Sequence, residues 1–185
     1  MDLLWIISIF WFISEAGLSY IKRASIDSKD VDKSSLKILQ IVIGGSVGLG
    51  IFLGMAGTGF INFYRDEAYI SGIILICLGL ALRWVAIFQL KKHFTVNVSI
   101  RKDHQLIQRG LYKYIRHPAY SGSLLSFFGL GLAFDNWLSL LIICLPITLA
   151  FFYRISVEEA ELSKAFGEKY DAYKKQTKRL IPGVY

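Results

Sequence analysis

The chain has 185 residues, 54% of them hydrophobic, and a formal net charge of +7. Its length fits one domain over residues 1–185, and its mean hydropathy of +0.47 is higher than that of ordinary soluble domains. The basic residues fall between apolar runs, so they favour membrane topology over a nucleic-acid-binding surface. Cys77 and Cys144 lie inside apolar runs, which argues against a disulfide, and no Cys/His spacing resembles a metal site.

The apolar runs predict an all-α integral membrane protein with about five transmembrane helices. These runs are Leu3–Tyr20, about Leu36–Ile61, about Ala68–Leu90, Ser121–Phe134 and Trp137–Tyr153. The first run lacks a basic leader and a convincing cleavage site, so we expect it to be retained. Only Asp135 and Asn136 separate the last two runs, which predicts an antiparallel helical hairpin. The fourth run is short, and it either begins before Ser121 or stops short of the far membrane face.

Lysine and arginine are concentrated after the first, third and fifth apolar runs. The positive-inside rule therefore predicts an external N-terminus, a cytosolic linker over residues 91–120 and a cytosolic C-terminal segment over residues 154–185. An odd number of spans agrees with this orientation.

The second apolar run is rich in glycine. Gly44 with Gly48, and Gly50 with Gly54, are small-xxx-small pairs that allow close approach of another helix. A nucleotide-binding loop is the alternative, but the third glycine of such a motif is missing at the required spacing. We therefore interpret these glycines as helix-packing positions.

A polar string precedes the fourth run. Pro118 disfavours helical geometry at His117, so we expect a break in the chain where this run begins. Backbone groups freed at the break need partners, which a bound ligand can supply. An interfacial kink with a snorkelling Arg116 and a solvated His117 fits equally well. Tyr112 and Tyr120 are either part of an interfacial aromatic belt or walls of a pocket.

A second polar string follows the fifth run, where residues 154–175 predict an amphipathic helix. Arg154, Glu158 and Glu161 share one face because their spacings are four and three, whereas Glu159 points elsewhere. A surface ion pair is the simpler interpretation. The hairpin, however, returns Glu158 to the membrane face where His117 lies, and this convergence favours a site.

Together these strings resemble the isoprenylcysteine carboxyl methyltransferase family, which groups with the phospholipid methyltransferases. The resemblance covers about residues 104–182. It is carried by Arg-His-Pro-Ala-Tyr-Ser-Gly (116–122), Arg-Ile-Ser-Val-Glu-Glu (154–159), Phe-Gly-Glu-Lys-Tyr (166–170) and Thr-Lys-Arg-Leu-Ile-Pro (177–182). The N-terminal half matches the family only in hydropathy.

The resemblance implies a membrane methyltransferase that uses S-adenosylmethionine and no metal. Its cofactor pocket would be formed by the linker, the hairpin and the C-terminal helix. By position, the implied cofactor-binding residues are Asn97, His104, Gln105, Leu106, Ile107, Tyr112, His117, Pro118, Ala119, Tyr120 and Glu158. Arg154 would align the methyl acceptor, and His117 or Glu158 would take a proton if the acceptor must lose one.

The acceptor implied by the family is the carboxylate of a prenylated cysteine, or a similar lipophilic substrate that enters from the bilayer. A phospholipid amine or an alkyl phenol is an alternative acceptor. Sterol-type membrane reductases share an Arg-His-Pro-x-Tyr string and use NADPH, so a reductase is a second candidate. The Glu158–Glu159 string and the single short hairpin favour methyl transfer. A structural scaffold, in which the polar residues only mark topology, is the third candidate.

Overall fold

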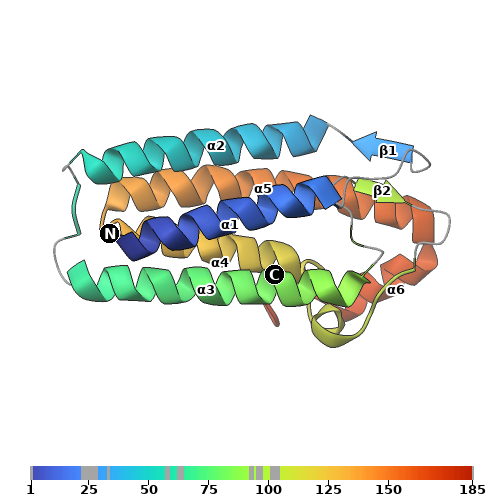
Figure 1. The fold of residues 1–185 in the computed structure, drawn as a ribbon. Coiled ribbons are helices and arrows are strands. Elements are labelled where there is room, and N and C mark those ends of the chain that lie inside the picture. Colours follow the sequence, from blue (N-terminus) through green and yellow to red (C-terminus); the bar gives the residue numbers. More distant parts are fainter. Residues whose placement is uncertain are drawn as a thin grey trace.

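Five long helices lie side by side in the computed structural model, and smaller polar elements cap one end of them (Figure 1). The structure describes residues 2–21, 29–32, 34–56, 59–61, 65–91, 94, 98–100 and 105–184. The long helices are α1 (Asp2–Ile21), α2 (Ser34–Met55), α3 (Arg65–Leu90), α4 (Pro118–Ala133) and α5 (Trp137–Phe166). The cap contains β1 (Lys29–Asp32), β2 (Val98–Ile100), the 3₁₀ helix η2 (Gly110–Lys113) and α6 (Glu168–Gln176).

The predicted membrane bundle of helices is confirmed. In the described part of the chain four helices, α1, α2, α3 and α5, are long and apolar enough to cross a membrane. With 16 residues, α4 rises only about 24 Å, so it is the short member of the hairpin. It begins at Pro118, before Ser121, which was one of the two expected solutions. The antiparallel pairing of β1 with β2 is an addition that the apolar runs did not predict.

Two predicted boundaries are wrong. The second helix ends at Met55 rather than Ile61, because Gly59 has φ +83 and Phe60 pairs with Asn136 in an isolated bridge. No new helix begins at Arg154, since α5 continues without a break to Phe166. The helix ends there because Gly167 adopts φ +53, and α6 follows at a new angle.

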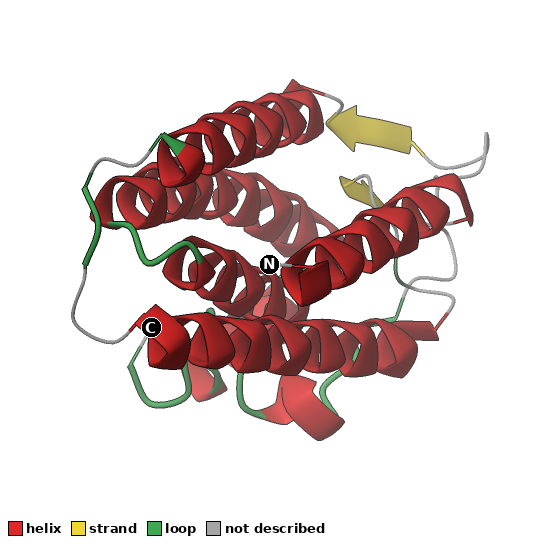
Figure 2. Cartoon of the chain, turned by 60° about the vertical axis from the view of Figure 1, so that its left-hand side comes forward, coloured by secondary structure: helices red, strands yellow, loops and turns green. Residues whose placement is uncertain are grey.

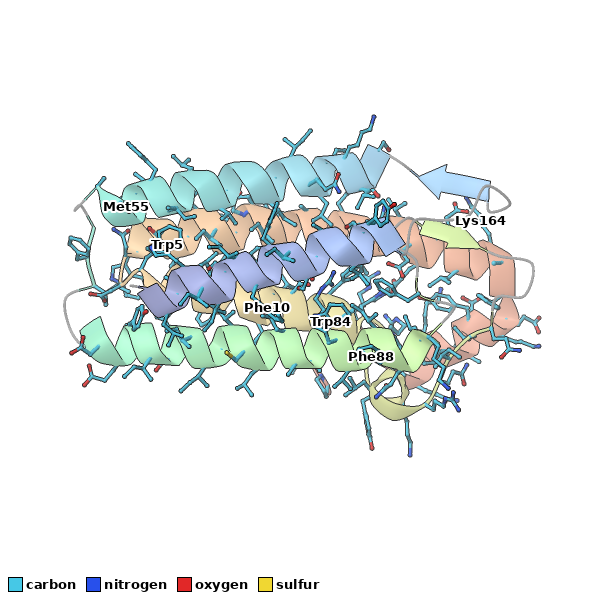
Figure 3. All side chains as sticks on the ribbon, in the orientation of Figure 1. Trp5, Phe10, Met55, Trp84, Phe88 and Lys164 are labelled. Atoms are coloured by element: carbon cyan, nitrogen blue, oxygen red, sulfur yellow. The ribbon has the colours of Figure 1, made fainter. Side chains whose placement is uncertain are left out.

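Polar side chains gather at the ends of the bundle, and most lie at the cap, where Lys164 is labelled in Figure 3. The start of α1 lies at the opposite end of the bundle, which is also the end of the α4–α5 turn (Figure 1). At that turn the Asn136 side chain accepts the backbone N–H groups of Leu138 and Ser139 at 2.9 and 3.0 Å, which caps α5.

Helices α3 and α4 are in close backbone contact. A Cβ atom added at Gly79 would lie 2.5 Å from the Gly122 carbonyl oxygen, and one at Gly72 would lie 2.6 Å from that of Gly129. Without side chains at these four positions the two backbones can touch. The seam therefore holds the start of α4 at a fixed position against α3.

The glycines of α2 divide into two groups. Gly50 and Gly54 face Ile143, Phe134 and Ser139 of the α4–α5 hairpin, as the packing interpretation predicted. No atom of the described residues lies within 4 Å of a Cβ added at Gly44 or Gly48, so the helix packing predicted for this pair is not seen within the chain. Open space lies beside them instead.

Helix α1 stands apart from the rest of the bundle (Figure 2). Among the described residues, its backbone approaches other helices closely only at isolated points. Leu4, Trp11 and Leu18 are buried, whereas Phe10 and Phe12 are exposed. The helix therefore packs through a few long side chains rather than through its backbone.

Candidate functional site

A cavity of about 990 Å³ runs along the inside of α1 and α2 and reaches the cap. Its part within the bundle, here called the apolar channel, is lined by Trp11, Ile43, Val47, Ile51, Phe127, Leu130 and others. Its part at the cap, the polar chamber, is lined by Arg116, His117, Tyr120, Arg154, Glu158, Glu161 and Tyr170. One continuous space thus joins an apolar region to a cluster of charged and aromatic side chains.

The predicted break before the fourth helix is present, and it forms one wall of the polar chamber. His117 has φ −124 and ψ 55, and Pro118 begins α4, where its missing N–H is harmless. The His117 carbonyl accepts the N–H groups of Tyr120 and Ser121 at 3.0 and 3.1 Å. The N–H groups of Arg116 and His117 donate to the carbonyls of Lys178 and Arg179 at 2.8 and 3.0 Å. The C-terminal tail, rather than a ligand, supplies these backbone partners.

Glu159 is the centre of the ionic network beneath this break. It is 6% exposed and accepts hydrogen bonds from Arg116 Nε at 2.8 Å and Arg179 Nη2 at 2.9 Å. His117 Nε2 lies 3.3 Å from the same carboxylate. The helical spacing correctly placed Glu159 off the face that carries Arg154. It did not predict that Glu159 binds Arg116 and Arg179. Glu159 therefore ties α5, the break and the tail together.

Arg154, Glu158 and Glu161 all line the polar chamber, on the shared helix face that their spacing predicted. The Tyr120 hydroxyl donates to Glu158 Oε2 at 2.7 Å. Arg154 is only 1% exposed, and its Nη1 donates to Ser35 Oγ of α2 at 2.5 Å. The chamber therefore presents a buried guanidinium and a carboxylate that is already oriented by a tyrosine.

Three buried tyrosines, Tyr112, Tyr170 and Tyr173, close the chamber from the cap side. The Tyr173 hydroxyl donates to the Tyr112 carbonyl at 2.6 Å, and the Tyr112 hydroxyl donates to the Ala86 carbonyl at 3.3 Å. Burial raises the pKa of Tyr173 to about 12 and, with the nearby Glu158 charge, raises that of Tyr112 further. These phenols are therefore neutral hydrogen-bond donors at neutral pH.

Tyr170 differs from its neighbours. Its hydroxyl oxygen is buried and has no hydrogen-bond partner among the residues that the structure describes. Burial, followed by the charges of Glu159 and Glu158, raises the pKa of this phenol. An unpaired buried hydroxyl destabilises a fold by about 1–3 kcal/mol, so this group is a candidate for contact with a ligand.

An ion pair inside the membrane region was not predicted from the sequence. Arg83 of α3 donates to the two carboxylate oxygens of Glu15 on α1, through Nε at 2.5 Å and Nη2 at 2.6 Å. Both residues line the cavity. A charged residue inside each of two apolar runs was a sufficient signal to find them, because intramembrane charges normally mark a functional position.

Most of the cofactor-binding residues implied by the resemblance line the cavity. Gln105, Leu106, Ile107, Tyr112, His117, Ala119, Tyr120 and Glu158 all line the cavity. Pro118 is fully buried at the start of α4, where it shapes the backbone. Asn97 and His104 lie outside the described residues.

The chain matches the model of the isoprenylcysteine carboxyl methyltransferase (ICMT) family over residues 72–164. It is 36% identical over 124 residues to a protein-S-isoprenylcysteine O-methyltransferase of Schizosaccharomyces pombe, which covers 66% of this chain and 52% of that protein. The corresponding B enzyme of Arabidopsis thaliana is 33% identical over 115 residues, or 61% of this chain and 58% of its own. The chain thus spans little more than half the length of these curated relatives.

A solved structure shares the fold. A eukaryotic intramembrane Ras methyltransferase, ICMT, superposes with a TM-score of 0.61 at 25% sequence identity. The match covers 83% of this chain and 55% of that structure. The similarity therefore includes most of the helices described above, not only the two polar strings.

Proposed function

The chain belongs to the isoprenylcysteine carboxyl methyltransferase family, and from that premise we propose that it methylates the carboxylate of a prenylated cysteine, with S-adenosylmethionine as donor. The observation that carries the proposal is one cavity that joins a polar chamber to an apolar channel. An amphipathic acceptor needs both environments. Lysine and arginine are concentrated after α1, α3 and α5, at the cap. The positive-inside rule therefore also supports a cytosolic active site, at the end of the bundle opposite the start of α1.

The chemistry of the polar chamber fits the cofactor. Glu158 can accept hydrogen bonds from hydroxyl or ammonium groups, and the unpaired Tyr170 hydroxyl can donate one. We propose that Gln105, Leu106, Ile107, Tyr112, His117, Ala119 and Tyr120 complete this pocket, with Pro118 shaping its backbone and Asn97 and His104 contributing from the linker. When bound, the cofactor supplies an electrophilic methyl group on a cationic sulfonium.

Arg154 is the proposed anchor for the acceptor carboxylate. Its guanidinium lies buried beside Ser35, and a guanidinium can hold a carboxylate through two parallel hydrogen bonds. Such alignment contributes much of the rate of an in-line displacement. Because a carboxylate anion is converted into a neutral ester, exclusion of water favours the reaction and no general base is required. His117 and Glu158 therefore bind and orient in this proposal.

The apolar channel is the proposed site of the prenyl chain. The lining residues of α2 extend from Leu36 to Ile51, a rise of about 22 Å along the helix, which is long enough for an extended isoprenoid. Gly44 and Gly48 leave this space free, and Trp11 and Phe12 of α1 form the opposite wall. The tail would enter from the bilayer beside the loosely packed α1 while the cofactor enters at the cap.

The other acceptors and the reductase reaction receive no support from the comparisons. Both relatives and the solved structure named above are methyltransferases, and the two relatives are named for isoprenylcysteine. No feature of the described residues singles out a phospholipid amine, an alkyl phenol or NADPH.

The test is calorimetric titration of S-adenosylhomocysteine into the detergent-purified protein, followed by methylation of N-acetyl-S-farnesylcysteine. We expect saturable binding that weakens about tenfold or more in Glu158→Gln, because a charge-assisted hydrogen bond is lost. Glu168→Gln, an exposed change on α6, is the matched control and leaves the affinity unchanged. Binding of NADPH in place of S-adenosylhomocysteine would overturn the proposal.

A further inference from the structure

The Arg83–Glu15 pair has no role in the function proposed above. It lies in the membrane region, about 10 Å before the end of α3 at Leu90, and both side chains face the cavity. The side chain of Arg83 is 12% exposed and that of Glu15 is 30% exposed. Removing two ions from water is unfavourable even when they pair, so such a pair is weak evidence for a purely stabilising role. Helix α1 is also held by the buried side chains of Leu4, Trp11 and Leu18.

The two members of the pair are held very differently. Arg83 is fixed against α4, because its Nη1 donates to Ser123 Oγ at 2.9 Å and to the Ala119 carbonyl at 3.3 Å. The glycine contact between Gly79 and Gly122 keeps that part of α4 in place. Glu15 belongs to α1, which packs loosely. The pair can therefore open on the Glu15 side while Arg83 stays in position.

The position of Arg83 connects it to the cofactor part of the cavity. Ala119, whose carbonyl it contacts, lies in the segment that the family resemblance assigns to the cofactor. A ligand group that carries both an ammonium and a carboxylate can exchange partners with an Arg–Glu pair and leave no ion unpaired. A ligand with only a carboxylate would free Glu15 inside the membrane region, which is unfavourable.

We infer that Arg83 and Glu15 form the binding site for the amino-acid end of the methyl donor, an inference that rests on the proposed function. Arg83 receives the α-carboxylate, and Glu15 receives the α-ammonium. The acceptor does not meet this requirement, because the nitrogen of a C-terminal prenylcysteine is part of a peptide bond. Two of the arginines that line the cavity thus bind different carboxylates: Arg154 binds that of the acceptor, and Arg83 binds that of the donor.

The test compares two ligands that differ in the amino-acid end. S-adenosylhomocysteine carries that end, whereas 5′-methylthioadenosine lacks it. The affinities are measured by calorimetry on the detergent-purified full chain. Arg83→Gln should lower the affinity for S-adenosylhomocysteine by about tenfold to a hundredfold, while the affinity for methylthioadenosine changes by no more than about twofold. Glu15→Gln should show the same selectivity with a smaller loss. Arg109→Gln, an exposed arginine before η2, should change neither affinity.

Methylthioadenosine also separates a lost contact from a lost fold, since a misfolded variant would bind neither ligand. If Arg83→Gln cannot be purified, Glu15→Gln decides alone, because it retains a hydrogen-bond acceptor of the same shape. Equal weakening of both ligands, or no weakening of either, overturns the inference. A raised KM for the acceptor with unchanged S-adenosylhomocysteine binding also overturns it and assigns Arg83 to the acceptor. If the unaltered protein binds neither nucleoside, the proposed function falls first and the inference with it.

Discussion

The α3–α4 seam and the α1–α2 region use glycine in opposite ways. At the seam, Gly79 and Gly122 bring two backbones into contact, and an added Cβ at either would meet main-chain atoms within 2.7 Å. In α2, Gly44 and Gly48 face open space that belongs to the cavity. The same residue type therefore builds the rigid half of the bundle and keeps the other half hollow.

This contrast explains how a membrane bundle can hold a precise site and still admit a bulky chain. The seam fixes Ala119 and Arg83 relative to each other, and the Glu159 network fixes His117 against α5 and the tail. On the other side, α1 covers the apolar channel without close backbone contact. The bundle is therefore rigid around the charged side chains of the polar chamber, and it leaves space in the apolar channel for a long apolar chain.

The largest effect is expected from a substitution that disrupts the α3–α4 seam. Gly122→Val places side-chain atoms against the Gly79 carbonyl and the Arg83 backbone nitrogen, at 2.5 and 2.6 Å from the Cβ, and neither atom can rotate away. We expect a loss of about 3 kcal/mol or more in the free energy of unfolding. Thermal unfolding in detergent measures it, with Gly44→Val as the matched control. Equal unfolding temperatures for the two variants would show that the seam is not rigid.

A smaller effect is expected from a substitution that fills the apolar channel. Gly48→Phe should leave the unfolding temperature and S-adenosylhomocysteine binding unchanged, because no described atom lies within 4 Å of its Cβ position. The ring should occupy the apolar channel and raise the KM for a geranylgeranylated acceptor by about tenfold, with a smaller rise for a farnesylated one. Gly45→Phe, on the neighbouring open position that does not line the cavity, is the control. An equal change for both chain lengths would remove the channel from the prenyl site.

Much of the bundle could be predicted from the sequence, because long apolar runs and the Arg154–Glu158–Glu161 spacing are local signals. The break at His117–Pro118 is equally local, since proline acts on the residue before it. The division of the glycines was not predictable, because it depends on which helix lies opposite. Glu159 was missed for the same reason, as Arg116 is 43 positions away in the chain. Arg83 and Glu15 are 68 positions apart, yet their charges alone were a usable signal.

A third prediction compares two tyrosines of α6. Tyr173→Phe removes the donor to the Tyr112 carbonyl and should lower the free energy of unfolding by about 1 kcal/mol. Tyr170→Phe removes a hydroxyl without a partner among the described residues, so it should leave stability unchanged or raise it by up to about 1 kcal/mol. If Tyr170 contacts the cofactor, S-adenosylhomocysteine binding weakens in that variant only. A stability loss in Tyr170→Phe equal to that of Tyr173→Phe would show that its hydroxyl is paired within the protein.

The smallest expected effect is a dependence on alkaline pH. Burial raises the pKa of Tyr173 from its usual 10.0 to about 12, although Arg116 opposes the shift, so the folded state favours the neutral phenol. The resulting stabilisation is complete below pH 10 and is lost as the pH rises through about 12. The unfolding temperature of the unaltered protein should therefore fall more steeply than that of Tyr173→Phe over this interval. Parallel curves would mean that Tyr173 ionises as freely in the folded protein as in the unfolded chain, and that the tyrosine wall of the polar chamber admits water.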